Sequence, residues 1–259
     1  MKRRDFLAAS AIAAAAAATT PQSAQAQTAG DERQYCEWRT YRATSAEKRK
    51  FIDDYLEKAA VPAWQRMGLG PVGVFAETGE DGTHAMHVLL TYPTLEEFAA
   101  AREALEQDPD YQKNAVDYFA VAQDAAAFER IDSSLMVAFA GHPQLTPPRE
   151  RGGFFELRTY ESHTEERARK KIDMFNSGEM PIFEKCGFEN VFFGETLIGR
   201  DLPNLKYMLA APDRAANEAA WKKFVVHPDW VAMKDNAEYK DTVSNVAKIY
   251  LEPTPYSQI

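Results

Sequence analysis

The sequence predicts an α+β protein built from two tandem ferredoxin-like units, each with the element order β-α-β-β-α-β. Three observations support this fold class. A repeat holds one offset of 119 residues along most of the chain, both copies show the same order of strand and helix patterns, and a stretch rich in proline and glycine separates them. In such a unit the helices cover one face of the four-stranded sheet. We therefore expect the two bare faces to pack sheet-to-sheet as a barrel around an inner cavity.

The composition limits the function classes. The chain has 259 residues, 45% of them hydrophobic, which is enough for one large domain or two small ones. Lys and Arg number 30 against 39 Asp and Glu, and this net charge of -9 argues against a nucleic-acid-binding face. Two cysteines exclude a disulfide scaffold and a four-cysteine metal site. Because no phosphate loop, serine-hydrolase elbow, covalent haem motif or zinc-protease motif is present, we expect no cofactor and no metal.

Residues 1–26 have the order of an export signal, with a basic start, a short alanine-rich stretch and a small-residue cleavage site. The pair Arg3 and Arg4, followed by Phe6, resembles the twin-arginine (Tat) signal of bacteria. Cleavage after Ala26 would leave 233 residues, with 27 basic and 38 acidic side chains. Since no later segment reaches about 18 consecutive apolar residues, we expect a periplasmic or otherwise exported protein without a membrane span after signal cleavage. The alternative is a disordered tail on a cytoplasmic protein.

The repeat sets the domain boundaries. Residues 35–41 (YCEWRTY) return as residues 154–160 (FFELRTY), and further landmarks hold the same offset: Pro62 and Pro181, Gly68 and Gly187, Pro93 and Pro212, Pro109 and Pro228. The sequence therefore predicts a signal peptide over residues 1–26, a first unit over 27–140, a linker over 141–153 and a second unit over 154–259.

The first half of each unit is a strand followed by a helix. The opening strands contain Glu37 and Glu156, with side chains alternating between two faces. A helix over residues 45–67 follows in the first copy, with a capping box at residues 44–47; residues 162–165 offer a second box one residue out of register. Glycines at positions 68 and 187 then end the helices in a left-handed conformation.

The second half of each unit continues with two strands, helical segments and a closing strand. The second strands are expected at residues 72–76 and 191–194, the third at 87–92 and 206–210, and the closing ones at 135–139 and 247–251. Thr94 and Asp213 cap the helix that follows the third strand. Pro109 and Pro228 open the next helical segment at their preferred first position. The closing strands do not hold the common offset, so we expect a longer loop before the first of them.

These motifs resemble the NIPSNAP family. The resemblance rests on the Glu-x-Arg-Thr-Tyr strands, on a proline followed by a helix-ending glycine, and on the Pro-Asp-Tyr or Pro-Asp-Trp helix starts, and it covers residues 35–252 in two copies. The second copy fits better, because Cys36 and Trp38 surround the glutamate of the first. The resemblance implies a fused form of the dimeric α/β barrel. It implies little about a reaction, since the family is mostly without an established one.

Strand alternation groups three polar residues of each opening strand on one face: Glu37, Arg39 and Tyr41, and likewise Glu156, Arg158 and Tyr160. Because Phe155 and Leu157 suit a face packed under helices, we expect this polar set to point into the barrel, with each arginine paired to a glutamate. The set could bind a ligand, with arginine taking a carboxylate, glutamate acting as a base and tyrosine as a donor. We favour the alternative, a structural ion-pair network.

His87 and Lys206 complete the candidate site. They occupy equivalent places on the third strands, from which both could reach the cavity. His84 lies three residues from His87, so the two make a poor metal pair. As a lone strand histidine, His87 is more often structural than catalytic. Cys36 and Cys186 do not occupy matched positions and are expected to be separate buried thiols.

Three function classes remain open. The first choice is an exported protein of unestablished activity that binds a small ligand in the barrel cavity. The alternatives are a cofactor-independent oxygenase or isomerase acting on a small aromatic or oxo-acid, as in relatives of the superfamily, and a structural or interaction protein with a filled barrel. A cavity large enough for a ligand, open to solvent and lined by the repeated Glu/Arg/Tyr set would favour the first two, and a barrel packed solid would favour the third. The partner predictions are a small-molecule ligand, no nucleic acid, and a monomer or homodimer.

Overall fold

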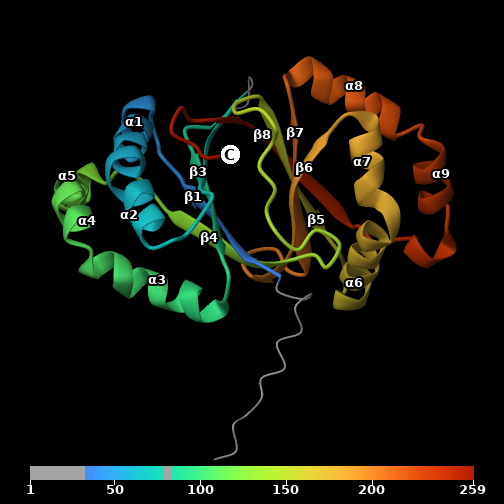
Figure 1. Ribbon diagram of the computed structural model, residues 1–259, viewed down its shortest axis with the longest axis horizontal. Coiled ribbons are helices and arrows are strands. Elements are labelled where there is room, and N and C mark those ends of the chain that lie inside the picture. Colours follow the sequence, from blue (N-terminus) through green and yellow to red (C-terminus); the bar gives the residue numbers. More distant parts are fainter. Residues whose placement is uncertain (1–32, 79–82) are drawn as a thin grey trace, which may run out of the picture. The chain divides into compact units, whose positions relative to one another are not determined.

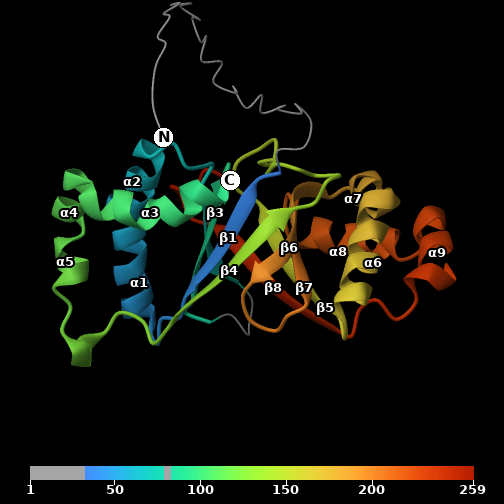
Figure 2. The same ribbon diagram turned by 90° about the horizontal axis from the view of Figure 1, so that it is seen from below.

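A computed structural model describes residues 33–78 and 83–259 of the protein. The predicted signal peptide, residues 1–26, lies outside the described residues. Within the described part, the strands form one closed antiparallel barrel in the order β1-β3-β2-β8-β5-β7-β6-β4. Figures 1 and 2 show the helices of the first half on one side of the barrel and those of the second half on the other.

The described elements of the first half follow the predicted order. Its strands are β1 (Tyr35–Tyr41), β2 (Gly73–Glu77), β3 (Met86–Tyr92) and β4 (Ile131–Ala138). Its helices are α1 (Ala46–Tyr55), the π-helical turn η1 (Leu56–Ala60), α2 (Val61–Arg66), α3 (Leu95–Gln107), α4 (Pro109–Asn114), α5 (Val116–Phe119) and the 3₁₀ turn η2 (Gln123–Ala125).

The second half repeats this order. Its strands are β5 (Phe154–Glu161), β6 (Glu189–Ile198), β7 (Asn204–Ala211) and β8 (Asn245–Pro253). Its helices are α6 (Glu165–Met174), the π-helical turn η3 (Phe175–Glu179), α7 (Met180–Cys186), α8 (Arg214–Phe224), α9 (Pro228–Lys234) and the 3₁₀ turn η4 (Ala237–Tyr239). No helix of the described segments has the length and apolar character needed to cross a membrane.

The predicted fold class is confirmed, and the structure adds how the barrel closes. Each half contributes a ferredoxin-like sheet, in the orders β4-β1-β3-β2 and β8-β5-β7-β6. The sheets meet by hydrogen bonding along their edges, β2 to β8 and β4 to β6, rather than only by packing face to face. Edge pairing of this kind removes the unpaired N–H and C=O groups that an open sheet exposes.

Local signals explain the helix starts. Ser45 caps α1 by accepting a hydrogen bond from the Lys48 N–H at 3.2 Å, and Thr164 caps α6 by accepting one from the Arg167 N–H at 3.3 Å. Ser45 and Thr164 hold the common offset, so the predicted shift of one residue between the two caps is wrong. Thr94 and Asp213 cap α3 and α8 as predicted.

The closing strands β4 and β8 hold equivalent places with a shifted offset. Asp132 lies opposite Thr40, whereas Ala247 lies opposite Thr159. The first copy is therefore four residues longer before its closing strand. The sequence predicted a longer loop at this place but not its length. Both strands begin earlier than predicted, because the outer part of each is exposed and carries few apolar residues.

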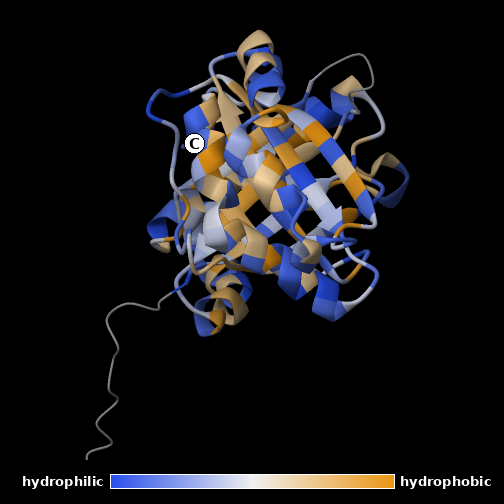
Figure 3. Cartoon of the chain, turned by 90° about the vertical axis from the view of Figure 1, so that its right-hand side faces the viewer, coloured by the Kyte–Doolittle hydropathy of each residue, from blue (hydrophilic) through white to orange (hydrophobic). Residues whose placement is uncertain are grey.

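Three apolar clusters hold the described part together, one under each helix layer and one inside the barrel. Hydrophilic and hydrophobic residues alternate along the strands (Figure 3). Leu145 of the linker and Ile259 belong to the barrel cluster. The Leu145 N–H bonds to Gln34 beside the start of β1, and residue 258 pairs with Val72 just before β2. These two segments therefore close one end of the barrel.

Candidate functional site

The two faces of β1 and β5 are reversed relative to the prediction. The barrel cluster contains Cys36 and Trp38 from β1 and Phe155 and Leu157 from β5, whereas Tyr41 belongs to the cluster under the helices. The expectation that the Glu/Arg/Tyr set points into the barrel is therefore wrong. The physical reason is that the interior of a closed eight-stranded barrel is a core in its own right and takes the apolar face of each strand.

The predicted ion pairs are nevertheless confirmed. Arg39 donates to both carboxylate oxygens of Glu37, from Nε at 3.0 Å and from Nη2 at 2.9 Å, and Arg158 Nε donates to Glu156 at 2.7 Å. Glu37 also accepts from the Tyr92 hydroxyl at 2.9 Å. These contacts satisfy carboxylates that are almost fully buried.

Aromatic side chains of the helices and strands complete these two pairs. The Arg39 and Arg158 guanidiniums lie 5.6 Å and 3.5 Å from the ring centres of Trp64 and Trp221, respectively. The Tyr160 hydroxyl accepts from that of Tyr207 at 2.7 Å. Six of the predicted residues do not line the barrel cavity: Glu37, Arg39, Tyr41, Glu156, Arg158 and Tyr160. Their assignment as ligand-binding residues stays a prediction, and their geometry is that of a structural network.

A cavity of about 760 Å³ occupies the other end of the barrel, away from Leu145 and Ile259. His87 and Lys206, the remaining two predicted residues, both line it. Its deeper wall is apolar and aromatic, with Trp38, Leu157 and Ile249. Its polar lining includes Thr40, Arg42, Glu77, Asp132, Ser134, Thr159, Arg200, Asp201 and Lys248.

One wall of the cavity carries a hydrogen-bonded chain of three side chains. Thr40 Oγ1 lies 3.0 Å from His87 Nδ1, and His87 Nε2 lies 2.9 Å from Glu77 Oε1. Burial alone would raise the pKa of Glu77, but hydrogen bonds from His87 and from the Thr83 N–H outweigh it and lower the pKa to about 2. Glu77 is therefore ionised, and the chain ends on a fixed negative charge.

The equivalent wall of the second half carries a cation instead. Lys206 Nζ donates to Thr159 Oγ1 at 3.1 Å, at the place where His87 contacts Thr40 in the first half. Burial lowers the pKa of Lys206, while the charges of Asp201 and Glu161 oppose that shift. Within the described residues no carboxylate lies in salt-bridge range of the Lys206 ammonium, so donors remain for a ligand.

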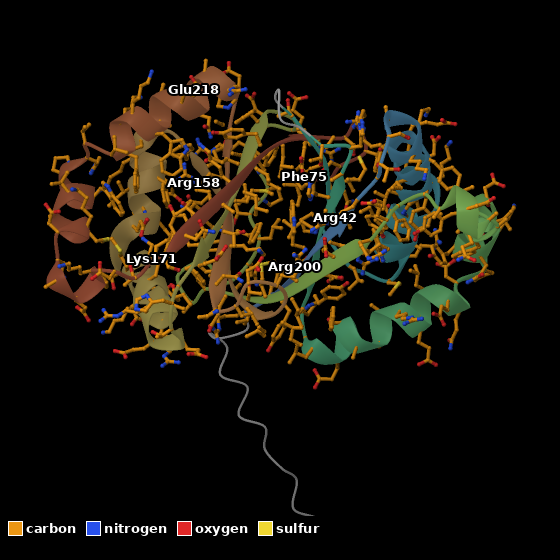
Figure 4. The ribbon with its side chains drawn as sticks, turned by 180° about the vertical axis from the view of Figure 1, so that it is seen from behind. Arg42, Phe75, Arg158, Lys171, Arg200 and Glu218 are labelled. Carbon is orange, nitrogen blue, oxygen red and sulfur yellow. The ribbon has the colours of Figure 1, made fainter. Side chains whose placement is uncertain are left out.

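Charged side chains surround the cavity mouth. Arg42 is paired with Asp132, and Arg200 Nη1 lies 3.7 Å from the other oxygen of the same carboxylate. Figure 4 shows Arg42 and Arg200 together at the barrel, whereas Arg158 and Lys171 lie on the side of the second helix layer. Within residues 33–78 and 83–259 no group of three or more His, Cys, Asp or Glu side chains is arranged to hold a metal ion. Cys36 and Cys186 are free and buried.

Sequence reasoning did not select Thr40, Glu77, Thr159 or Asp132 as site residues. A signal for the two threonines was present, because Thr40 and Thr159 repeat at the common offset on the strand face opposite Glu37 and Glu156. Glu77 and Asp132 carried no comparable signal. They reach the cavity only through the strand register that places β2 and β4 beside β3 and β1.

Comparison with known proteins agrees with this repeat. The family model described as NIPSNAP matches residues 36–140 and again residues 155–258. The chain belongs to the NIPSNAP family. A search of the curated proteins found no match. The two NIPSNAP segments correspond to the two halves of the barrel, so each half contributes one wall of the cavity.

Solved structures similar to this NIPSNAP protein share its fold. A candidate monooxygenase of Fusobacterium nucleatum subsp. nucleatum is 11% identical with a TM-score of 0.56, covering 85% of this chain and 92% of that one. A candidate monooxygenase of Lactobacillus acidophilus is 14% identical with a TM-score of 0.56, covering 85% and 93%. Chlorite dismutase of Candidatus Nitrospira defluvii is 10% identical with a TM-score of 0.50, covering 87% and 92%. These likenesses show the fold, a fused dimeric α/β barrel.

Proposed function

We propose that this protein binds a small ring-bearing acid in the open end of its barrel. The observation that carries the proposal is the half-buried ammonium of Lys206 on the wall of a cavity whose deeper surface is apolar and aromatic. A cavity of about 760 Å³ lies within the range of roughly 300–1,000 Å³ that small-molecule sites occupy.

The chemistry of the lining selects the ligand class. A desolvated ammonium forms its strongest contact with an anionic oxygen such as a carboxylate. The faces of Trp38, Leu157 and Ile249 suit a flat apolar ring. A barrel filled by side chains would not leave a cavity of this volume. It would also not need a cation such as Lys206, which has no carboxylate partner in salt-bridge range among the described residues. The cavity therefore supports the ligand-binding prediction over the purely structural one.

Calorimetric titration with phenylpyruvate, a ring-bearing 2-oxo acid, tests this proposal. We expect the wild type to bind it, and Lys206→Met to bind about 10- to 100-fold more weakly, since a hydrogen bond to a charged group contributes about 1.5–3 kcal/mol. The matched control is Lys222→Met, the same charge loss on the exposed face of α8, which should bind like the wild type. Absence of binding, or equal affinity in the Lys206→Met variant, would overturn the proposal.

A further inference from the structure

The chain Thr40–His87–Glu77 has the order hydroxyl, imidazole, carboxylate. Its members come from three neighbouring strands, β1, β3 and β2, and Thr40 and His87 are direct cross-strand partners. The contacts of 3.0 Å and 2.9 Å are both within hydrogen-bond range. A hydroxyl in contact with a base that a third group orients is an arrangement that activates the hydroxyl.

The direction of each hydrogen bond follows from the charge on Glu77. An ionised carboxylate only accepts, so His87 Nε2 carries the hydrogen and donates it to Glu77. In the neutral ring Nδ1 then has a lone pair, and the Thr40 hydroxyl donates to it. His87 is 3% exposed whereas Thr40 is partly exposed. Both side chains line the cavity, and Thr40 is the more exposed of the two, so its hydroxyl is open to a ligand while it contacts the imidazole.

The neighbouring carboxylate Asp132 is paired with guanidinium groups rather than with the imidazole. It lies beside Thr40 on β4 and faces the same cavity. Its two carboxylate oxygens are engaged by Arg42 and Arg200. Glu77, by contrast, contacts the imidazole directly and stabilises an imidazolium at that position.

The second half of the barrel places a cation where the first half places this base. Lys206 replaces His87 at the same offset, and Thr196 stands in the place of Glu77, where its hydroxyl donates to Asn204 at 2.6 Å. β1 and β5 lie four places apart in the ring of eight strands, so the two walls oppose each other across the cavity. The duplicated framework thus carries a proton acceptor on one side and an anion-binding group on the other.

We propose that Thr40, His87 and Glu77 remove a proton from the carbon next to the carbonyl of a bound ring-bearing 2-oxo acid, with Lys206 facing both the carboxylate and the adjacent enolate oxygen. The C–H bond breaks, and its electron pair forms the C=C bond of the enolate while the carbonyl oxygen takes the negative charge. The proton passes to Thr40 Oγ1 as the hydroxyl proton of Thr40 passes to His87 Nδ1. The imidazolium is paired with Glu77, and no other reactant is needed. This inference rests on the proposed function.

Hydrogen–deuterium exchange of the benzylic protons of phenylpyruvate in D₂O, followed by NMR, tests the proton transfer. We expect the wild type to exchange them faster than buffer does. Thr40→Val keeps the shape of the side chain and removes the hydroxyl, so exchange should fall at least about 100-fold while calorimetric affinity stays near that of the wild type. His87→Gln should lose exchange to a similar extent. The control is Thr91→Val, a buried threonine on β3 that bonds to the Gly70 carbonyl and does not line the cavity.

The outcomes separate the inference from the proposed function. Binding of phenylpyruvate with exchange no faster than in buffer overturns the proton transfer and leaves ligand binding standing. Equal exchange in Thr40→Val and the wild type also overturns it, as does an equal loss in Thr91→Val. Absence of binding overturns the proposed function and the inference together.

Discussion

At the scale of single residues, folding lowers the pKa of the cavity-lining Glu77 carboxyl well below its ordinary value. Its carboxylate accepts from His87 Nε2 and, through the other oxygen, from the Thr83 N–H at 2.9 Å. Both bonds favour the ionised form over the protonated one, and together they outweigh the cost of partial burial. The carboxylate that contacts the histidine therefore also makes folding depend on pH.

The sign of that dependence is fixed by the direction of the shift. The pKa of Glu77 is lowered from 4.5 to about 2 on folding, so its stabilising effect is complete above about pH 4.5 and is lost as the pH falls toward 2. We predict that Glu77→Gln lowers the free energy of unfolding at neutral pH, and that the difference from the wild type shrinks between pH 4.5 and 2. Urea denaturation at a series of pH values measures it. A difference independent of pH would contradict the role given to this carboxylate.

Alternation along β1 and β5 correctly predicted which residues share a face, but not which face is inside. The inference used Phe155 and Leu157 as markers of a helix-covered face. In a fused barrel both faces of a strand are covered, one by helices and one by the opposite wall, so apolar residues do not discriminate between them. The partners that satisfy Glu37, among them Tyr92 and Ser133, depend on strand register and could not be derived from local sequence.

At the scale of elements, both copies interrupt the helix after their opening strand at the same place, by a π-helical turn in the first copy and by a kink at Gly178 within η3 in the second. η1 ends one residue before Val61 and η3 one residue before Met180, and a proline follows at positions 62 and 181. Proline has no N–H to donate to the preceding turn, so the regular hydrogen-bond ladder is interrupted there. The sequence predicted one continuous helix over residues 45–67. It gave no indication of the π turn, because its hydrophobic spacing stays close to that of an α-helix.

The two copies differ in the side chains that pair across this interruption. Lys171 and Glu179 form a buried ion pair at 2.6 Å, with side chains 3% and 1% exposed, whereas Ile52 and Ala60 occupy the equivalent positions of the first copy. Lys171 Nζ also lies 4.6 Å from the ring centre of Phe175. Burial raises the pKa of Glu179, against the lowering effect of the Lys171 charge. The first copy shows that the fold itself does not require the pair.

We predict that removing one partner is more harmful than removing both. Lys171→Met leaves a buried carboxylate without its cation and should lower the free energy of unfolding by about 3–5 kcal/mol. Lys171→Met combined with Glu179→Leu replaces the pair by apolar side chains of similar volume and should recover most or all of that loss. Chemical denaturation of the two variants and of Glu179→Leu alone completes the cycle. A double variant no more stable than Lys171→Met would contradict the prediction.

At the scale of the whole molecule, the linker and the last residues have a role beyond connection. The sequence predicted residues 141–153 only as a break between units, yet Leu145 packs in the barrel core together with Ile259. A Cβ on Gly73 would lie 2.6 Å from the Phe75 ring and 2.9 Å from the Ile259 side chain, so glycine leaves room for both side chains beside β2. Such packing between distant segments leaves no local pattern in the sequence.

Export through residues 1–26 and the monomeric or dimeric state stay predictions.

The duplication gives the cavity its chemical asymmetry. The same arrangement of a strand threonine beside a third-strand side chain occurs as Thr40 with His87 and as Thr159 with Lys206. Either half alone would supply only one of the two walls. The proposed ligand binding therefore depends on the closed barrel rather than on a single NIPSNAP unit.

The most direct test of the central claim is a crystal structure of the protein with bound phenylpyruvate. We predict electron density for the ligand inside the barrel, with its carboxylate at about 3 Å from Lys206 Nζ. Its ring should lie against Trp38 and Leu157, and its benzylic carbon on the side of Thr40. Density under either helix layer, beside Arg39 or Arg158, or a cavity without ligand at concentrations that saturate binding in solution, would contradict the claim.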